Sequence, residues 1–156
     1  MAMAHDAIRL DGRIAIITGG AGGIGAATAQ LMARRGAMVA IADIAFERAQ
    51  AVAAGIPGAL ALHLDLEDEA SIEAMVAHTV AHFGRLDILH NNAALLGPDI
   101  ARADGDIEHM DTALWDRTYR VNVRGTMIAA RAALPHLRET KGNIVNTVSS
   151  LALQGH

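Results

Sequence analysis

A short glycine-rich segment, residues 18–25, constrains the fold of this chain more than any other stretch. An apolar run with β propensity, residues 13–17, precedes it, and the small helix-forming residues 26–34 follow it. Glycine accepts positive φ and has no Cβ, so it lets a backbone turn approach an anionic ligand closely. The following helix directs its free N–H groups at that ligand. The segment therefore predicts a phosphate-binding turn between a strand and a helix.

Two glycine patterns fit this segment, and the residues alone leave both open. Gly20, Gly22 and Gly25 match G-x-G-x-x-G, whereas Gly19, Gly23 and Gly25 match G-x-x-x-G-x-G. A glycine-rich loop that binds no ligand is the alternative. We favour nucleotide binding because the flanking strand, the flanking helix and an acidic residue further along the chain all agree with it.

That acidic residue follows the second apolar run, residues 37–42. Asp43 lies close to the offset of about 20 residues expected for an acid that bonds the ribose hydroxyls of NAD. A carboxylate there repels a 2′-phosphate, and neither the glycine turn nor residues 44–45 offer an arginine or lysine to bind one. The sequence therefore predicts NAD in preference to NADP. A solvated aspartate at a strand end is the alternative.

Apolar runs and helical segments alternate along the whole chain. The predicted strands are residues 13–17, 37–42, 59–64, 86–90 and 143–148, and the predicted helices are residues 26–34, 46–54, 69–83 and 112–137. This alternation predicts an α/β fold, a Rossmann-type doubly wound parallel sheet with strand order 3-2-1-4-5. Ligands bind such sheets at the carboxyl ends of the strands, at the switch point between the first and fourth strands. We therefore expect the chemistry to lie just after each strand.

Composition is typical of one soluble domain and argues against several classes of function. The 156 residues, 52% of them hydrophobic, are enough for a single domain spanning residues 1–156. The chain has no cysteine, which excludes disulfides and thiol chemistry. A net charge of −4 with scattered basic residues argues against binding nucleic acid or an anionic membrane. Residues 1–11 do not resemble a signal peptide and no apolar run could span a membrane, so we expect a cytoplasmic protein.

One pair of histidines has a spacing that occurs in metal sites. His78 and His82 are four residues apart on a predicted helix, so both lie on one face. No third ligand accompanies them in the sequence. We interpret the pair as part of a solvated helix face and expect no metal site.

Several motifs resemble cofactor-binding elements of the short-chain dehydrogenase/reductase family, and the resemblance covers nearly the whole chain. Residues 18–25 match the family's cofactor turn in its own register, which implies cofactor contacts at Thr18, Gly19, Gly23, Ile24 and Gly25. Asp65 and Leu66 look like the acidic and aliphatic pair that the family places against the adenine ring. Residues 91–94 are similar to its N-N-A-G element, with alanine in place of the usual glycine, and imply contacts at Asn92, Ala93 and Ala94.

Two further motifs resemble the family's catalytic elements. The motif V-N-V after W-D looks like the helix with the catalytic asparagine, which implies Asn122, and the last predicted strand implies Ser150 as the catalytic serine. A serine hydroxyl can polarise a carbonyl oxygen and an asparagine can hold a water, but neither titrates near neutral pH. In the family the acid/base is a tyrosine, and a lysine follows it four positions later. Both lie beyond the serine. The single tyrosine, Tyr119, and the single lysine, Lys141, match neither place.

The resemblance implies an NAD-dependent oxidoreductase that transfers a hydride between the nicotinamide and a small-molecule alcohol or ketone. Because the sequence ends at His156 without the tyrosine and lysine, we expect the cofactor-binding N-terminal part of such an enzyme, in a domain whose C-terminal strands and helices are absent from this chain. The fourth and fifth strands are then expected to be covered on one face only. The resemblance also implies a homo-oligomer. Two alternatives stay open: a non-catalytic NAD-binding module, and an interaction protein that packs its bare sheet face against a partner.

Overall fold

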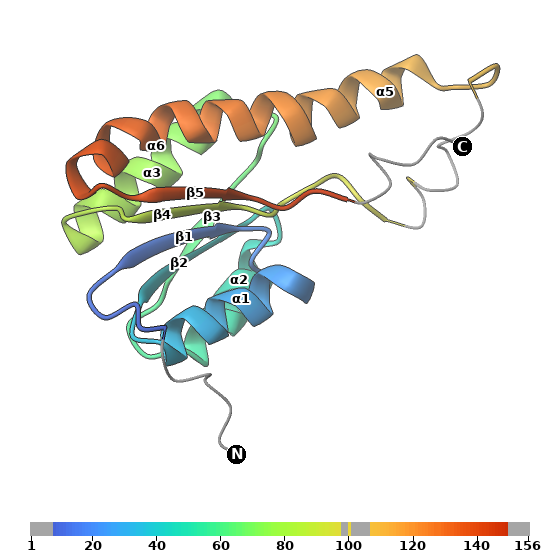
Figure 1. Cartoon of the computed structure of the whole chain (residues 1–156). Coiled ribbons are helices and arrows are strands. Elements are labelled where there is room, and N and C mark those ends of the chain that lie inside the picture. Colours follow the sequence, from blue (N-terminus) through green and yellow to red (C-terminus); the bar gives the residue numbers. More distant parts are fainter. Residues whose placement is uncertain (1–7, 98–99, 101–106, 150–156) are drawn as a thin grey trace.

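A parallel sheet forms the centre of the molecule (Figure 1). The structure is a computed structural model, and it describes residues 8–97, 100 and 107–149. The strands of the described residues are β1 (Ile14–Thr18), β2 (Met38–Asp43), β3 (Leu60–His63), β4 (Ile88–Asn91) and β5 (Asn143–Asn146). They lie in the order β3-β2-β1-β4-β5, and every neighbouring pair is parallel. The predicted Rossmann-type topology is therefore confirmed, with the switch point between β1 and β4.

Two layers of helices bury opposite faces of this sheet (Figure 1). The helices on one face are α1 (Gly23–Arg34) and α2 (Phe46–Ala54), and those on the other are α3 (Glu69–Phe83) and α6 (Thr126–Thr140). Alternate residues of a strand point to opposite faces. Ile16 of β1 therefore packs in the core beneath α3 and α6, whereas Ile17 packs in the core beneath α1 and α2. Burial on both faces explains why the run that forms β1 is apolar throughout.

Turn and capping residues set the bounds of the helices. α3 begins after Asp68, whose carboxylate accepts a hydrogen bond from the Ala70 N–H at 3.0 Å. It ends at Gly84, which has a φ of 81° and lies in the left-handed region that favours glycine. α2 ends where Gly55 begins a turn that contains Pro57. Both helices have the bounds that the sequence predicted.

The long helix predicted over residues 112–137 is continuous but changes pitch. α5 (Thr112–Tyr119) passes into a π-helical segment, η1 (Arg120–Gly125), and then into α6, which ends at Thr140. π-helical turns within α-helices are frequent at functional sites. The change of pitch falls on Asn122, the predicted catalytic asparagine.

Ion pairs fasten this long helix to the start of α3. Glu67 accepts from Arg117 at 2.9 Å and from Arg120 at 3.2 Å, and Glu69 accepts from Arg124 and Arg131. The buried side chains lie further along, in α6, at Ile128, Ala129, Ala133 and Leu137. α5 contributes none of the buried residues in the described part of the chain. α6 is thus held by apolar contacts and by the ion pairs of Arg131, whereas α5 has no buried residue and is held by the ion pair of Arg117.

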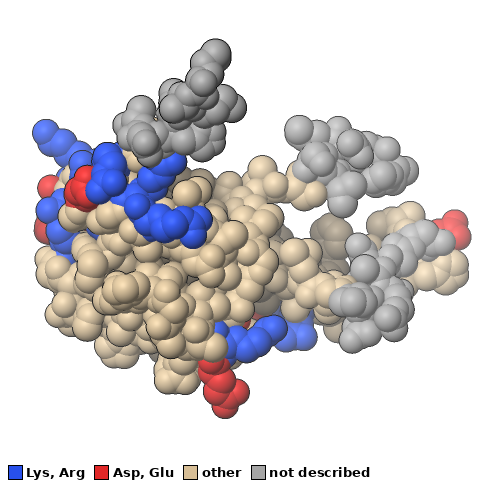
Figure 2. Space-filling model, turned by 90° about the horizontal axis from the view of Figure 1, so that it is seen from below, with Lys and Arg blue, Asp and Glu red and all other residues tan. Residues whose placement is uncertain are grey.

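β4 and β5 are covered by helices on one face only, as predicted (Figure 1). β5 lies at the edge of the sheet, and all four of its residues are exposed. Val145 pairs with His90, on the face opposite α6. Figure 2 views the molecule from this side and shows a mostly uncharged surface, with basic and acidic side chains at its margins. In the ranges that the structure describes, no helix is both long enough and apolar enough to cross a lipid bilayer.

Candidate cofactor-binding site

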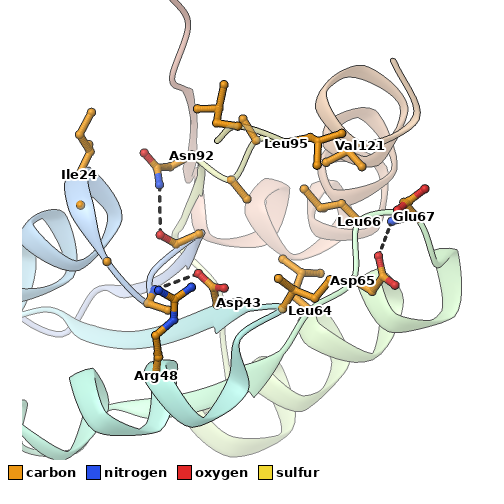
Figure 3. Close-up of a pocket in the computed structure, with 18 of the residues that line it drawn as sticks. Ile24, Asp43, Arg48, Leu64, Asp65, Leu66, Glu67, Asn92, Leu95 and Val121 are labelled. Atoms are coloured by element: carbon orange, nitrogen blue, oxygen red, sulfur yellow. Dashed lines mark hydrogen bonds between the residues drawn. The ribbon is translucent and has the colours of Figure 1, made fainter. Parts of the chain in front are cut away.

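A cavity of about 650 Å³ opens at the carboxyl ends of the strands (Figure 3). It extends from the glycine turn after β1 to the segments that follow β2, β3 and β4. The predicted cofactor residues that line it are Gly19, Gly23, Ile24, Asp43, Asp65, Leu66, Asn92, Ala93 and Ala94. The structure therefore brings residues from four strand ends together in one cavity.

The glycine turn packs directly on the segment that follows β4. Gly19 has a φ of 66°, and a Cβ there would lie 2.8 Å from the Ala93 Cα atom. A Cβ at Gly25 would overlap the Gly19 carbonyl oxygen. Gly23 has a positive φ of 52°, whereas Gly22 has an extended backbone with a φ of −178°. These constraints agree with the G-x-x-x-G-x-G pattern.

Thr18 and Asn92 hold the turn in place from beneath. The buried Thr18 hydroxyl oxygen accepts hydrogen bonds from the N–H groups of Asn92 and Ala93, each at 3.0 Å. The Asn92 side chain in turn donates to the Thr18 carbonyl oxygen at 3.0 Å. Thr18 itself does not line the cavity, but its hydroxyl lies against the main chain of Asn92 and Ala93, which do, and its predicted contact with the cofactor stays a prediction. Its role in the structure is to join the ends of β1 and β4.

Asp43 lies at the end of β2 with its carboxylate fixed by two main-chain donors. One carboxylate oxygen accepts from the Ala21 N–H at 3.0 Å, and the other accepts from the Ala45 N–H at 2.9 Å. A carboxylate oxygen can accept more than one hydrogen bond. Both oxygens therefore keep the capacity to accept from a ligand that enters the cavity.

Arg48 lines the same cavity, although the sequence analysis did not single it out. Its main-chain N–H donates to the Ala45 carbonyl oxygen at 3.0 Å, in the first turn of α2. Figure 3 shows its side chain rising from α2 toward Asp43. The signal that could have found it is the helix start at Phe46, since the first turn of a helix that follows β2 lies near the end of that strand.

The wall opposite the glycine turn joins the segment after β3 to η1. The Asp65 carboxylate accepts from the Glu67 N–H at 2.8 Å and so closes a tight turn. The buried Leu66 packs against Gly125, where a Cβ would lie 2.7 Å from the Leu66 carbonyl oxygen. Glycine at this position lets the long helix approach the cavity closely.

Asn122 connects η1 to the segment after β4. Its side-chain oxygen accepts from the Leu95 N–H at 2.7 Å, and Leu95 and the neighbouring Val121 both line the cavity. Asn122 itself does not line the cavity but adjoins two residues that do, and its catalytic role stays a prediction. Ser150, the predicted catalytic serine, lies outside the described residues.

A buried histidine that the sequence analysis did not assign joins β4 to β5. The Nε2 atom of His90 lies 2.9 Å from the Thr147 hydroxyl oxygen, and Nδ1 has no hydrogen-bond partner among the described residues. Burial lowers the pKa of the His90 ring, so the neutral form is favoured near pH 7. Asn91 donates to the Asn146 side chain at 2.9 Å beside it. These polar contacts hold the edge strand in register.

We also looked among the described residues for a second cavity and for groups that could hold a metal ion. A second cavity, of about 580 Å³, lies near the C-terminal ends of α1 and α2 and is lined by none of the predicted site residues. Across the described ranges, no group of three or more histidine, aspartate and glutamate side chains is placed to hold a metal ion.

Comparison with known proteins relates the chain to one family. The family model described as short chain dehydrogenase matches residues 13–156. The chain is 44% identical over 153 residues to sorbitol dehydrogenase of Cereibacter sphaeroides, and 37% identical over 150 residues to meso-2,3-butanediol dehydrogenase of Serratia marcescens. Each alignment covers 95% of this chain and 57% of the relative, so the chain spans a little over half the length of these curated relatives. Because the family match includes every segment that lines the cavity, the chain belongs to the short chain dehydrogenase family.

Proposed function

We propose that these residues form the cofactor-binding part of an NAD-dependent oxidoreductase that acts on a small-molecule alcohol or ketone. The observation that carries the proposal is the single cavity that joins the glycine turn, Asp43 and residues 92–94 at the switch point of the sheet. Two relatives are named as dehydrogenases of sorbitol and of meso-2,3-butanediol, which supports an alcohol as the substrate.

The geometry of the turn fits a dinucleotide. The main chain at Gly19 and Gly25 is packed so closely that no Cβ fits. α1 begins between them, at Gly23, and its first N–H groups would point at a bound pyrophosphate. Asp43 would accept from the ribose hydroxyls, and Asp65 and Leu66 would lie against the adenine. When bound, the nicotinamide supplies the carbon that accepts or donates the hydride.

Two residues of the proposed site act on the substrate oxygen and its surroundings. The Asn122 side-chain oxygen is occupied by the Leu95 N–H, which leaves its amide N–H groups to donate to a water at the cavity wall. Ser150 would donate a hydrogen bond to the carbonyl oxygen, where negative charge develops during hydride transfer. Neither group exchanges a proton near neutral pH, so the proton must come from a separate acid or base.

Asp43→Asn is expected to raise the dissociation constant of NAD by roughly ten- to a hundredfold. The change keeps the size of the side chain but removes a charged acceptor, and hydrogen bonds to charged groups contribute about 1.5–3 kcal/mol. Isothermal titration calorimetry with NAD measures the effect. Asp68→Asn is the matched control, because Asp68 caps α3 outside the cavity and asparagine caps a helix equally well. Equal affinity in wild type and Asp43→Asn would contradict the proposed ribose contact.

Turnover distinguishes this proposal from the two alternatives. NADH formation with a panel of secondary alcohols supports the oxidoreductase. NAD binding without turnover favours a non-catalytic NAD-binding module. An interaction protein is favoured if Asp43→Ala abolishes NAD binding and leaves association with a partner unchanged.

We also propose that the protein is a homo-oligomer that associates through the long helix. Four apolar side chains on this helix are half exposed or more: Trp115 at 58%, Tyr119 at 58%, Val123 at 50% and Met127 at 52%. They recur every four residues and so form a stripe. Four arginines of the helix pair instead with Glu67 and Glu69, just before and at the start of α3: Arg117, Arg120, Arg124 and Arg131. Exposed apolar stripes of this kind are typical of protein interfaces.

Met127→Arg is expected to shift the protein to a smaller oligomer, because a buried unpaired charge at an apolar interface is strongly unfavourable. Sedimentation velocity measures the change in mass. Leu31→Arg is the control, because Leu31 is 48% exposed on α1, away from the stripe. An unchanged sedimentation coefficient for Met127→Arg would exclude the stripe as the interface.

A further inference from the structure

We propose that His90 is a positioning residue for the dinucleotide: through Thr147 and Asn92, it holds the glycine turn in the place where the turn receives the cofactor. The inference rests on the proposed function, because its effect is felt in the same cavity. His90 does not line that cavity. It acts from within the sheet, through two other side chains.

A continuous run of polar contacts leads from His90 to the glycine turn. The Nε2 atom of His90 lies 2.9 Å from the Thr147 hydroxyl oxygen, and that hydroxyl donates to the Asn92 side-chain oxygen at 3.5 Å. The Asn92 side-chain nitrogen then donates to the carbonyl oxygens of Thr18 at 3.0 Å and of Gly19 at 3.4 Å. Figure 3 shows Asn92 donating to the turn. The edge strand and the cofactor turn are therefore joined by side chains alone.

The donors along this run fix the position of the proton on the His90 ring. The Asn92 nitrogen donates to the turn, so its oxygen is the atom that faces Thr147. A hydroxyl has one hydrogen, and Thr147 gives it to Asn92, so the hydroxyl oxygen accepts from His90. Nε2 therefore carries the proton. The buried Nδ1, which has no partner among the described residues, is then a bare lone pair.

Asn92 contacts the turn at the point where the turn has least room. A Cβ at Gly19 would lie 3.0 Å from the Asn92 side-chain nitrogen, and a Cβ at Gly25 would lie 2.8 Å from it. If the amide rotated, its oxygen would face the carbonyl oxygens of the turn, and two acceptors repel each other. The Thr147 hydroxyl opposes that rotation because it donates to the amide oxygen. His90 in turn orients the hydroxyl.

Packing alone does not account for a histidine at this position. The register partners of His90 are Ile17 of β1 and Val145 of β5, which are both apolar. The buried Nδ1 atom is unpaired among the described residues, and an unpaired buried polar atom is unfavourable. A leucine would remove that atom and keep the apolar contacts. What the histidine supplies, and leucine cannot, is the donor at Nε2.

The test is the binding of NAD to the whole chain, measured by isothermal titration calorimetry. His90→Leu and Thr147→Val are each expected to raise the dissociation constant of NAD by about three- to tenfold, which corresponds to the loss of one neutral hydrogen bond. The double variant is expected to bind as well as either single one, because both changes remove the same link. The conservative changes His90→Gln and Thr147→Ser keep a donor and a hydroxyl, and are expected to keep most of the affinity.

Asn146→Ala is the matched control. It removes the 2.9 Å side-chain bond from Asn91 to Asn146, which joins the same two strands as His90 and Thr147 do. The bond lies on the opposite face of the sheet, because Asn91 and Asn146 are each one residue beyond the pair formed by His90 and Val145. The control is expected to lower the urea midpoint of unfolding and to change the dissociation constant of NAD by less than about twofold.

Nuclear magnetic resonance reads the proton on the ring directly. The ¹⁵N chemical shifts of an imidazole distinguish a protonated nitrogen from a bare one, and the signals of His90 are those missing from the spectrum of His90→Leu. At pH 7 we expect a protonated Nε2 and a bare Nδ1. A proton on Nδ1 instead would overturn the inference, because Thr147 would then donate to the ring and not to Asn92.

The binding data separate a failure of this inference from a failure of the proposed function. The inference alone is overturned if wild type binds NAD and both His90→Leu and Thr147→Val bind it equally well. It is also overturned if Asn146→Ala weakens binding as much as they do, or if His90→Gln loses as much affinity as His90→Leu. Absence of NAD binding to wild type would overturn the proposed function together with this inference.

Discussion

Gly25→Ala is expected to lower the free energy of unfolding by about 3 kcal/mol and to abolish dinucleotide binding. The new Cβ would overlap the Gly19 carbonyl oxygen and lie 2.8 Å from the Asn92 side-chain nitrogen. Adding a methyl group to a packed site costs about 1–3 kcal/mol, and the upper end applies here because the obstacle is main chain. Relief of the overlap moves the glycine turn away from the segment after β4, which opens the phosphate site. Urea unfolding followed by circular dichroism measures the stability, and calorimetry with NAD measures the binding.

Gly22→Ala is the matched control for stability within the same turn. Gly22 has an extended backbone, and a Cβ there would meet nothing within 4 Å. Its free energy of unfolding is therefore expected to stay within about 0.5 kcal/mol of wild type. If Gly25→Ala were as stable as Gly22→Ala, the close packing described for Gly25 would be wrong.

Asp87→Ala is expected to destabilise the protein by roughly 3 kcal/mol, the lower end of the range for removing one partner of a buried ion pair. The Asp87 side chain is 1% exposed and accepts from Arg13 at 2.8 Å, from Arg85, and from the Ile14 N–H at 3.0 Å. Its loss leaves the Ile14 N–H buried at the start of β1 without that acceptor. The two arginines are about half exposed and can return to water, which keeps the effect at the lower end. Urea unfolding at pH 7 measures it.

Acid should reduce the difference between wild type and Asp87→Ala. Burial opposes ionisation of Asp87, but hydrogen bonds from Arg85, Ile14 and Arg13 outweigh it and hold its pKa below the ordinary value of 3.8. The stabilisation is therefore complete above that value and is lost as the pH falls through the lower pKa of the folded state. Asp11→Ala is the control, because the Arg9–Asp11 pair is exposed and its removal should have little effect at any pH. A difference that stays constant down to strong acid would contradict the role of the ionised carboxylate.

Local signals predicted most of the fold. The bounds of α2 and α3 match the prediction because Gly55, Asp68 and Gly84 mark helix ends through their own chemistry. β4 begins at Ile88, two residues later than predicted, since Leu86 and Asp87 are buried but precede the β4 ladder. Asp87 already hydrogen-bonds through its main chain to Ile14 and Asn143, so the sequence pattern of a strand extends to the margin of the ladder. The π-helical segment was not predicted either, because the residues of η1 suit an ordinary α-helix equally well.

The residues of the candidate site also differ in how well the sequence alone could place them. Residues that follow a strand directly, such as Asp43 and Asn92, could be placed from the topology, because parallel strands end at one edge of the sheet. Arg48 was not singled out, although the predicted helix start at Phe46 already placed it in the first turn after β2. The structural role of Thr18 was also hidden, since a residue at a strand end can face the ligand or the main chain of its neighbour, and the sequence does not distinguish the two.

The unequal attachment of the long helix makes one wall of the cavity sensitive to ionic strength. Ions screen the pairs of Arg117 and Arg120 with Glu67, which are partly exposed, and leave the apolar contacts of α6 unchanged. Added salt therefore loosens α5, which has no buried residue, while Val121 of η1 and the buried side chains of α6 stay packed against the core. Amide hydrogens of α5 should then exchange faster as salt rises, and those around the buried residues of α6 should change less, so that one helix behaves as two units of different stability.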